Sequence, residues 1–252
     1  MSNDPLTRFR DVTYETFRSL AADGSLSPQE KIGFPDAYRD GLDDVILADI
    51  RAKVPALDRA GALVVDIGIG CGSLALALIE HARAHALSLV AVDSREMLDV
   101  LPTHPGLRKE AGFYPRDLLA LTEELRGKVD AIVCYSVFHY VFRETSATEF
   151  LDRALSMLAP GGVMLVGDIP NVSQRNRFFS SAAGVAYHQK FTQTDTQPTT
   201  QFNALDVGAI DDGILLGLVA RYRHAGYDAY VVAQQPELPM ANRREDLLFR
   251  RP

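Results

Sequence analysis

The sequence has few of the features that mark secreted, membrane-spanning or nucleic-acid-binding proteins. It contains only two cysteines in 252 residues, which excludes a disulfide framework and favours a reducing compartment. No apolar run approaches the roughly 18 residues that a membrane span needs. Residues 1–20 also lack the basic and then apolar segments of a secretion signal. We therefore expect a cytoplasmic protein that does not enter a membrane.

Positive charge is also scarce, since the formal net charge is −7 and the lysines and arginines are spread along the chain. Proteins that bind nucleic acid concentrate these residues in basic patches, so a nucleic-acid partner is not expected. The hydrophobic fraction of 47% and the charged fraction of 23% are those of an ordinary globular protein. The length suits one large domain with an elaboration.

Apolar runs typical of β-strands alternate with patterns typical of amphipathic helices. The strand patterns cover residues 63–67, 88–92, 130–135 and 162–166, and the helical patterns cover 73–86, 95–101 and 145–158. This alternation predicts the α/β class, with a doubly wound, mostly parallel sheet. Its ligand crevice is expected at the carboxyl ends of the strands.

Three further segments complete the predicted organisation. Residues 1–57 contain helical patterns at 8–20 and 37–54 and are expected to form an N-terminal helical cap on a ligand-binding domain of residues 58–252. Residues 170–209 show weak periodicity and are expected to form an irregular lid insertion. A helical pattern at 211–224 precedes two strand patterns, 227–233 and 245–250, which favour an antiparallel pair at the sheet edge.

The most informative motif is a turn with three alternating glycines, Gly68, Gly70 and Gly72, which follows Asp66 at the end of a predicted strand. Glycines let a ligand contact bare backbone, and the N–H groups of the helix that follows favour an anionic or carboxylate-bearing ligand. A dinucleotide loop has its third small residue one position later. A nucleoside triphosphate loop needs a lysine that is absent here.

Asp93 ends the next predicted strand. An acid in this place can accept hydrogen bonds from ribose hydroxyls, as in dinucleotide-binding folds. Capping of the following helix is the alternative.

Asp66 and the three glycines match D-x-G-x-G-x-G, the first motif of the class I S-adenosylmethionine-dependent methyltransferases, and the run from Asp93 to Leu98 resembles that family's continuation. The resemblance covers about residues 60–168 and 211–250. It implies a seven-stranded sheet with an antiparallel C-terminal strand, and S-adenosylmethionine as the cofactor. Its implied cofactor-binding residues are Asp66, Gly68, Gly70 and Gly72 at the methionine end, Asp93 and Ser94 at the ribose, Asp117 at the adenine and Ser136 at the crevice. Asp117 could equally cap the next helix.

The acceptor follows by elimination. The fourth predicted strand ends in Cys134, Tyr135 and Ser136, without the acidic metal ligands of catechol-type enzymes or the motifs of nucleic-acid methyltransferases. The resemblance therefore implies a small polar acceptor, methylated at oxygen, and no metal. Residues 167–171 and the Arg-Phe that follows resemble methyltransferases of bacterial surface-sugar biosynthesis; secondary-metabolite biosynthesis is a second setting.

Three residues are candidate bases for a hydroxyl acceptor: His139, Asp168 and His188. Structural histidines bonded to backbone are the alternative. The candidate substrate-binding residues are Tyr140, Arg175, Arg177 and Tyr187. The arginines could clamp a carboxylate or phosphate, or could be ordinary surface charge.

Two rival functions stay open. A nicotinamide-dependent oxidoreductase on a similar fold is disfavoured by Ser73 and by the lack of an obvious Tyr-x-x-x-Lys pair. The other rival is a protein that binds the cofactor to regulate. Whether the chain acts alone or as a homodimer is also left open.

Overall fold

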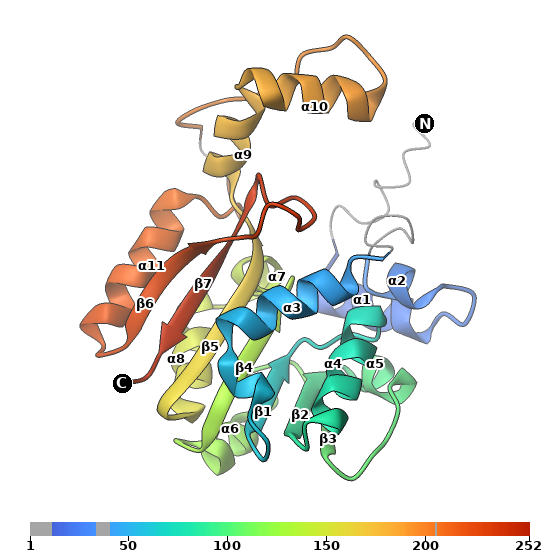
Figure 1. The fold of residues 1–252 in the computed structure, drawn as a ribbon, viewed down its shortest axis with the longest axis vertical. Coiled ribbons are helices and arrows are strands. Elements are labelled where there is room, and N and C mark those ends of the chain that lie inside the picture. Colours follow the sequence, from blue (N-terminus) through green and yellow to red (C-terminus); the bar gives the residue numbers. More distant parts are fainter. Residues whose placement is uncertain (1–11, 34–40, 205) are drawn as a thin grey trace.

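The computed structural model describes residues 12–33, 41–204 and 206–252, so residues 8–11 and 37–40 of the predicted N-terminal helices lie outside it. Seven strands form one sheet in the order β3-β2-β1-β4-β5-β7-β6 (Figure 1). Neighbouring strands are parallel except where β7 pairs antiparallel with β5 and β6. The strands are β1 Leu63–Ile67, β2 Ser88–Asp93, β3 Leu107–Ala111, β4 Val129–Tyr135, β5 Leu158–Pro170, β6 Asp228–Ala233 and β7 Arg244–Arg250.

Helices pack on both faces of the sheet. Successive residues of each strand point to opposite faces, so Val65 and Ile132 belong to one hydrophobic core while Val64 and Val133 belong to the other. The helices are α1 Tyr14–Ala22, α2 Pro28–Lys31, α3 Asp43–Lys53, the 3₁₀ turn η3 Pro55–Asp58, α4 Ser73–Ala84, α5 Arg95–Val100, α6 Leu119–Leu125, α7 Phe138–Glu144, α8 Ala147–Met157, α9 Val172–Phe179, α10 Ala182–Thr192 and α11 Asp212–His224. The predicted doubly wound α/β fold is confirmed.

Strand β3 was not predicted from the sequence. Its sequence is Leu-Arg-Lys-Glu-Ala, and every residue in it is at least partly exposed because the strand lies at the sheet edge. An edge strand need not carry the continuous apolar run of a central parallel strand. The C-terminal strands are antiparallel as predicted, but β7 inserts between β5 and β6.

The expectation that residues 170–209 are irregular is wrong, because this segment contains α9 and α10. Asn171 caps α9 by accepting from the N–H groups of Ser173 and Gln174, and Ser181 caps α10. The two helices form an arm, residues 172–192, that projects from the sheet (Figure 1). Phe179 and Gly184 are the buried residues of these two helices. The arm buries little apolar surface, and its sequence therefore shows weak periodicity.

The helices α1 and α2 lie over the carboxyl ends of the first strands. Arg18 of α1 forms an ion pair with Glu96 of α5 at 2.7 Å. Gln29 of α2 accepts a hydrogen bond from the N–H of Ser73, the first residue of α4. These contacts join α1 and α2 to the glycine turn and its neighbours. Within the described residues, none of the helices is both long and apolar enough to cross a membrane.

Candidate functional site

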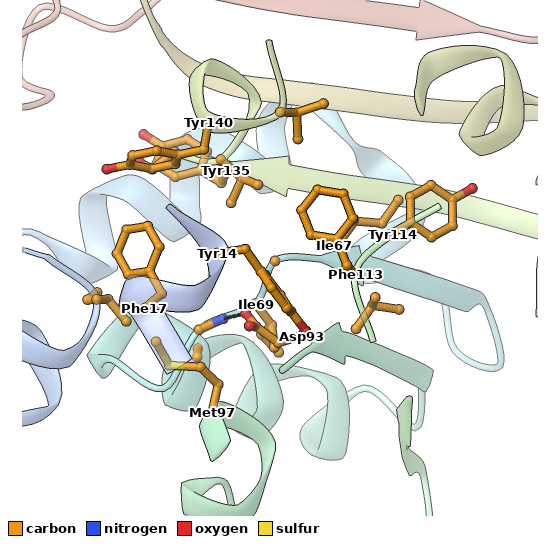
Figure 2. A pocket seen from close by; sticks show the side chains of 18 of the residues that line it. Tyr14, Phe17, Ile67, Ile69, Asp93, Met97, Phe113, Tyr114, Tyr135 and Tyr140 are labelled. Carbon is orange, nitrogen blue, oxygen red and sulfur yellow. Dashed lines mark hydrogen bonds between the residues drawn. The ribbon is translucent and has the colours of Figure 1, made fainter. Parts of the chain in front are cut away.

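A pocket opens at the carboxyl ends of β1, β2 and β4 (Figure 2). Its walls are mainly apolar and aromatic, and a few polar groups face it, which is the usual composition of a small-ligand site. The aromatic lining residues are Tyr14, Phe17, Phe113, Tyr114, Tyr135, Tyr140 and Phe150, and the polar ones include Asp93, Ser136 and Glu144.

The glycine turn forms one side of this pocket. Gly68 and Gly70 have φ values of +81° and +67°, a region that glycine occupies without strain. A Cβ on Gly68 would lie 2.6 Å from Cγ2 of Val137, and one on Gly72 would lie 2.6 Å from Cδ1 of Ile32. Glycine is therefore required in this turn for two reasons. It allows the positive φ angles of Gly68 and Gly70, and it leaves room for the side chains of Val137 and Ile32.

Asp93 faces the pocket from the end of β2. Its carboxylate accepts hydrogen bonds from the N–H groups of Gly70 at 2.8 Å and Ser94 at 2.6 Å. Desolvation nevertheless raises the pKa of Asp93 to about 6, against the lowering effect of those two bonds. The cap of α5 is supplied by Ser94, whose Oγ accepts from the N–H of Met97. The carboxylate of Asp93 is thus left to face the pocket.

Asp66 lies behind the glycine turn, 6% exposed and outside the pocket lining. Burial raises its pKa to about 8, and the neighbouring charge of Asp93 adds to the shift. At neutral pH its carboxyl group is therefore mainly protonated in this structure. A neutral carboxyl can donate one hydrogen bond as well as accept others.

Asp117 lies on the surface beside the pocket, outside its lining. Its carboxylate accepts from the N–H of Phe113 at 3.0 Å and from Arg116 at 2.8 Å, and Arg116 lowers its pKa. Helix α6 begins with Leu118 as its N-cap and no side-chain cap bond. After β3 the pocket is instead lined by Gly112, Phe113 and Tyr114.

Ser136 and Asp168 meet at the ends of β4 and β5. Both have positive φ, +61° and +60°, which is uncommon outside glycine and is found at functional sites. Ser136 lines the pocket and its hydroxyl donates to Oδ2 of Asp168. Arg244 of β7 donates to the same oxygen at 2.7 Å and to the Asp168 carbonyl at 3.0 Å. The structure thus adds an arginine that the sequence analysis did not connect to this acid.

A buried polar network supports Asp168 from behind. Asp246 of β7 is fully buried and accepts from the N–H of Asp168 at 2.8 Å, from Gln234 at 3.0 Å and from Lys53 at 2.7 Å. Lys53 also pairs with Asp49. Burial raises the pKa of Asp246, and Lys53 opposes that shift. The network fixes the backbone at the end of β5 through contacts with α3 and β7.

His139 and Tyr140 lie in the first turn of α7, which begins at Phe138. The two rings lie 4.0 Å apart between centroids. Tyr140 lines the pocket and contacts Phe17 edge-on at 5.0 Å, whereas His139 lies outside the pocket lining. Of these two predicted residues, Tyr140 is therefore the one placed at the pocket.

The other predicted acceptor residues gather on the arm, outside the pocket lining. Arg177 pairs with Asp212 of α11, and the guanidinium of Arg175 lies over Phe179. Tyr187 stacks on Phe191, and His188 interacts with Thr196 at 3.4 Å. All four residues lie on the arm, and the partners named here are Phe179 and Phe191 of the arm, Thr196 just after it and Asp212 of α11.

The contribution of α1 to the pocket was not predicted from the sequence. Tyr14 and Phe17 line it, and the N–H of Tyr14 donates to the Glu144 carboxylate at 3.0 and 3.2 Å. Burial, with a smaller contribution from Asp93, raises the pKa of the Tyr14 hydroxyl to about 12. The helical pattern predicted α1. No local pattern indicated that Tyr14 and Phe17 would lie at the pocket beside the end of β4, more than 100 residues later in the chain.

Comparison with known proteins gives a consistent result. Residues 64–162 match the methyltransferase domain family. A chemotaxis protein methyltransferase of Klebsiella aerogenes is 37% identical over 73 residues, which are 29% of this chain and 25% of that protein. The chain thus spans about a quarter of the length of this curated relative.

Solved methyltransferase structures share the fold. The CurJ carbon methyltransferase superposes with a TM-score of 0.56 at 14% identity, over 98% of this chain and 65% of that one. The plantazolicin methyltransferase BpumL, solved with a monoazolic desmethylPZN analog and S-adenosylhomocysteine, gives 0.54 at 11% identity, over 94% and 96%. At such identities the likeness establishes the fold and leaves the acceptor open.

Proposed function

We propose that the chain is a class I S-adenosylmethionine-dependent methyltransferase and that it transfers the cofactor's methyl group to an oxygen of a small polar metabolite. The match of residues 64–162 to the methyltransferase domain family and the shared fold support this proposal. One observation carries the proposal. A single pocket is bordered by the glycine turn and Asp93 on one side and by Ser136, which is bonded to Asp168, on the other.

The lining residues fit the cofactor. The backbone of Gly68, Gly70 and Gly72 would hold the methionine end, with Asp66 behind it, and the Asp93 carboxylate would accept from the ribose hydroxyls. The aromatic rings of Phe113 and Tyr114 would cover the adenine in place of a contact from Asp117. When bound, the cofactor supplies a sulfonium methyl that is already electrophilic. The chain then needs to align the acceptor and exclude water.

On the acceptor side we propose Asp168 and Tyr140, together with Ser136, which the resemblance had placed with the cofactor. The hydroxyl of Ser136 donates to Asp168 and leaves its own oxygen able to accept from an acceptor hydroxyl. As the acceptor loses its proton to Ser136, Ser136 passes its own to Asp168. Arg244 holds the Asp168 carboxylate in place, so Asp168 acts as an oriented proton acceptor. His139, which lies just outside the pocket lining, is proposed as a second candidate base.

The arm is proposed as a lid over the acceptor. Arg175, Tyr187 and His188 would meet an acceptor by movement of the arm, and Arg177 would first have to leave Asp212. An acceptor from bacterial surface-sugar or secondary-metabolite biosynthesis is proposed on the resemblance of residues 167–171.

The test is incubation with methyl-labelled S-adenosylmethionine and fractionated metabolites, followed by mass identification of the labelled product. Ser136→Ala and Asp168→Asn should lower kcat and leave cofactor affinity nearly unchanged, because they alter the acceptor side. Calorimetry with NAD provides the opposing test: binding of NAD and not of S-adenosylmethionine would support an oxidoreductase. Tight cofactor binding with no labelled product from any fraction would favour a regulatory role.

A further inference from the structure

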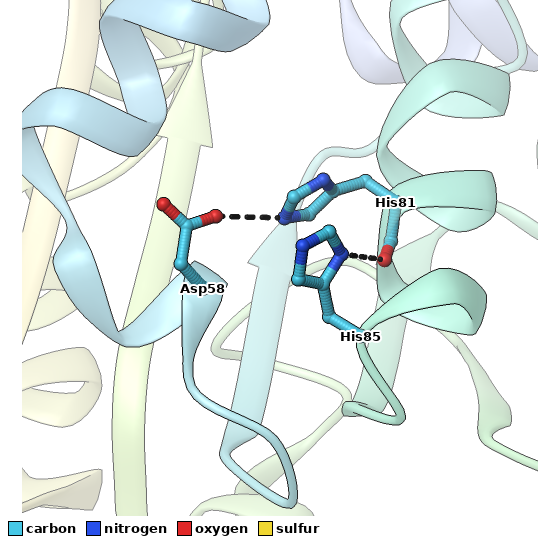
Figure 3. A group of neighbouring side chains, drawn as sticks. All are labelled: Asp58, His81 and His85. Atoms are coloured by element: carbon cyan, nitrogen blue, oxygen red, sulfur yellow. Dashed lines mark hydrogen bonds and ion pairs between the residues drawn. The ribbon is translucent and has the colours of Figure 1, made fainter.

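A group of metal-ligating side chains lies far from the pocket. Asp58 ends η3, just before β1, and His81 and His85 lie one turn apart at the end of α4 (Figure 3). One ligand atom from each residue lies within 4.8 Å of the others. Helix α4 begins at the glycine turn, so its far end points away from the pocket, and none of these three residues lines it.

We propose that Asp58, His81 and His85 bind a divalent first-row transition ion of the Zn²⁺ class. Imidazole nitrogens and a carboxylate oxygen are the ligands that Zn²⁺ accepts in proteins. Histidines at positions i and i+4 present both rings on one face of a helix. The third ligand comes from a separate element, so the ion would bridge η3 and α4.

The ring of His85 and the carboxylate of Asp58 are oriented by neighbouring bonds. Nδ1 of His85 lies 3.0 Å from the carbonyl oxygen of His81. A proton held there leaves Nε2 with its lone pair free, which is the arrangement of most metal-ligating histidines. The Asp58 carboxylate accepts from Nε of Arg51 at 2.8 Å, and ligating carboxylates are commonly held by such a second partner.

His81 is the buried member of the group. Its Nε2 lies 2.9 Å from the carbonyl oxygen of Leu57 and 3.2 Å from Oδ1 of Asp58. Ligand atoms of a tetrahedral zinc ion lie about 3.4 Å apart, so the 3.2 Å between His81 Nε2 and Asp58 Oδ1 suits a shared ion. The ion takes the place of the Nε2 proton, which moves to Nδ1 or to solvent.

A bound ion would join the segment that enters β1 to the helix that leaves the glycine turn. The two ends of this strand–turn–helix unit would then be joined at the amino end of β1, on the side of the sheet away from the pocket. The ion would stabilise the fold and take no part in methyl transfer. This inference does not rest on the proposed function.

The test uses the full chain, free of any affinity tag and stripped with chelator, and titrates it with Zn²⁺ by calorimetry. We expect one ion per chain and a rise in Tm on the order of 5 °C when Zn²⁺ is well above its Kd. His85→Gln and Asp58→Asn should each weaken binding at least about tenfold, since even outer partners of a metal site change affinity by that much. Asp58 is exposed, so Asp58→Asn should fold as the parent does and tests the site even if His85→Gln misfolds.

His224→Gln is the matched control. Its Nδ1 also lies 3.0 Å from the carbonyl four residues earlier at a helix end, but His224 belongs to no group of three potential ligands among the described residues. It should bind Zn²⁺ as the parent does. Absence of stoichiometric binding, or binding by His85→Gln and Asp58→Asn equal to that of the parent, would overturn the proposal.

Discussion

Replacement of Asp93 by asparagine should sharply weaken the binding of S-adenosylmethionine. Asp93 receives the N–H groups of Gly70 and Ser94 on its two different oxygens. An asparagine has one acceptor oxygen, so its NH₂ group would face one of those N–H donors or turn toward the ligand. Loss of a hydrogen bond to a charged group costs about 1.5–3 kcal/mol, which is about 10- to 100-fold in Kd.

Calorimetry with S-adenosylmethionine and S-adenosylhomocysteine measures this effect, and Asp117→Asn is the control. The Asp117 carboxylate is occupied by Phe113 and Arg116 outside the pocket, so its variant should keep the parental Kd. Unchanged affinity in Asp93→Asn, or an equal loss in Asp117→Asn, would refute the assignment of Asp93 to the ribose.

The same residue predicts a pH dependence. The pKa of Asp93 is raised to about 6 by desolvation, and a carboxylate is needed to accept from ribose hydroxyls. Affinity should therefore be full above that pH and fall as the pH drops through it. In Asp93→Asn the decline over this range should disappear. A parental affinity that is constant from pH 7 to about pH 5 would contradict this account.

Three further variants test the frame of the site. The folded-state pKa of Asp66 is about 8, above the ordinary value of 3.8, so the folded protein binds the extra proton and loses stability as pH rises between those values; Asp66→Asn should raise Tm relative to the parent above pH 8 and not near pH 4. Asp246→Ala leaves Lys53 with one fewer buried partner and should lower the free energy of unfolding by about 3–5 kcal/mol in urea titrations. Gly68→Ala should lower it by at least about 1–2 kcal/mol through its positive φ. A Cβ at position 68 would also meet the side chain of Val137. If Gly68→Ala loses more stability than its φ angle explains, the double variant Gly68→Ala/Val137→Ala should recover part of that extra loss in thermal unfolding.

Much of the central architecture can be predicted from the sequence, because it depends on patterns of neighbouring residues. The parallel strands β1, β2 and β4 are buried on both faces and therefore read as continuous apolar runs. The glycine turn is a contiguous motif whose backbone angles require its residue type. Asp93 follows directly from its place at a strand end.

The elements that the sequence concealed depend on partners distant along the chain. The edge strand β3 and the arm helices bury too little surface to impose a clear period. The pairing of Arg244 with Asp168 could not be predicted from the sequence. It depends on the position of β7 in the sheet, where β7 lies between β5 and β6 although it follows β6 in the chain.

The α/β class, the glycine turn and the acid that faces the pocket can be predicted from the amino-acid sequence, since each is set by local spacing and burial. The positions of Tyr14 and Phe17 in the pocket lining, the ion pair between Asp168 and Arg244, and the place of Asp117 outside the pocket become visible in the folded chain alone. Those arrangements arise from which faces of separate elements meet. Packing over the whole chain decides them, because no local pattern encodes a contact between residues so far apart in sequence.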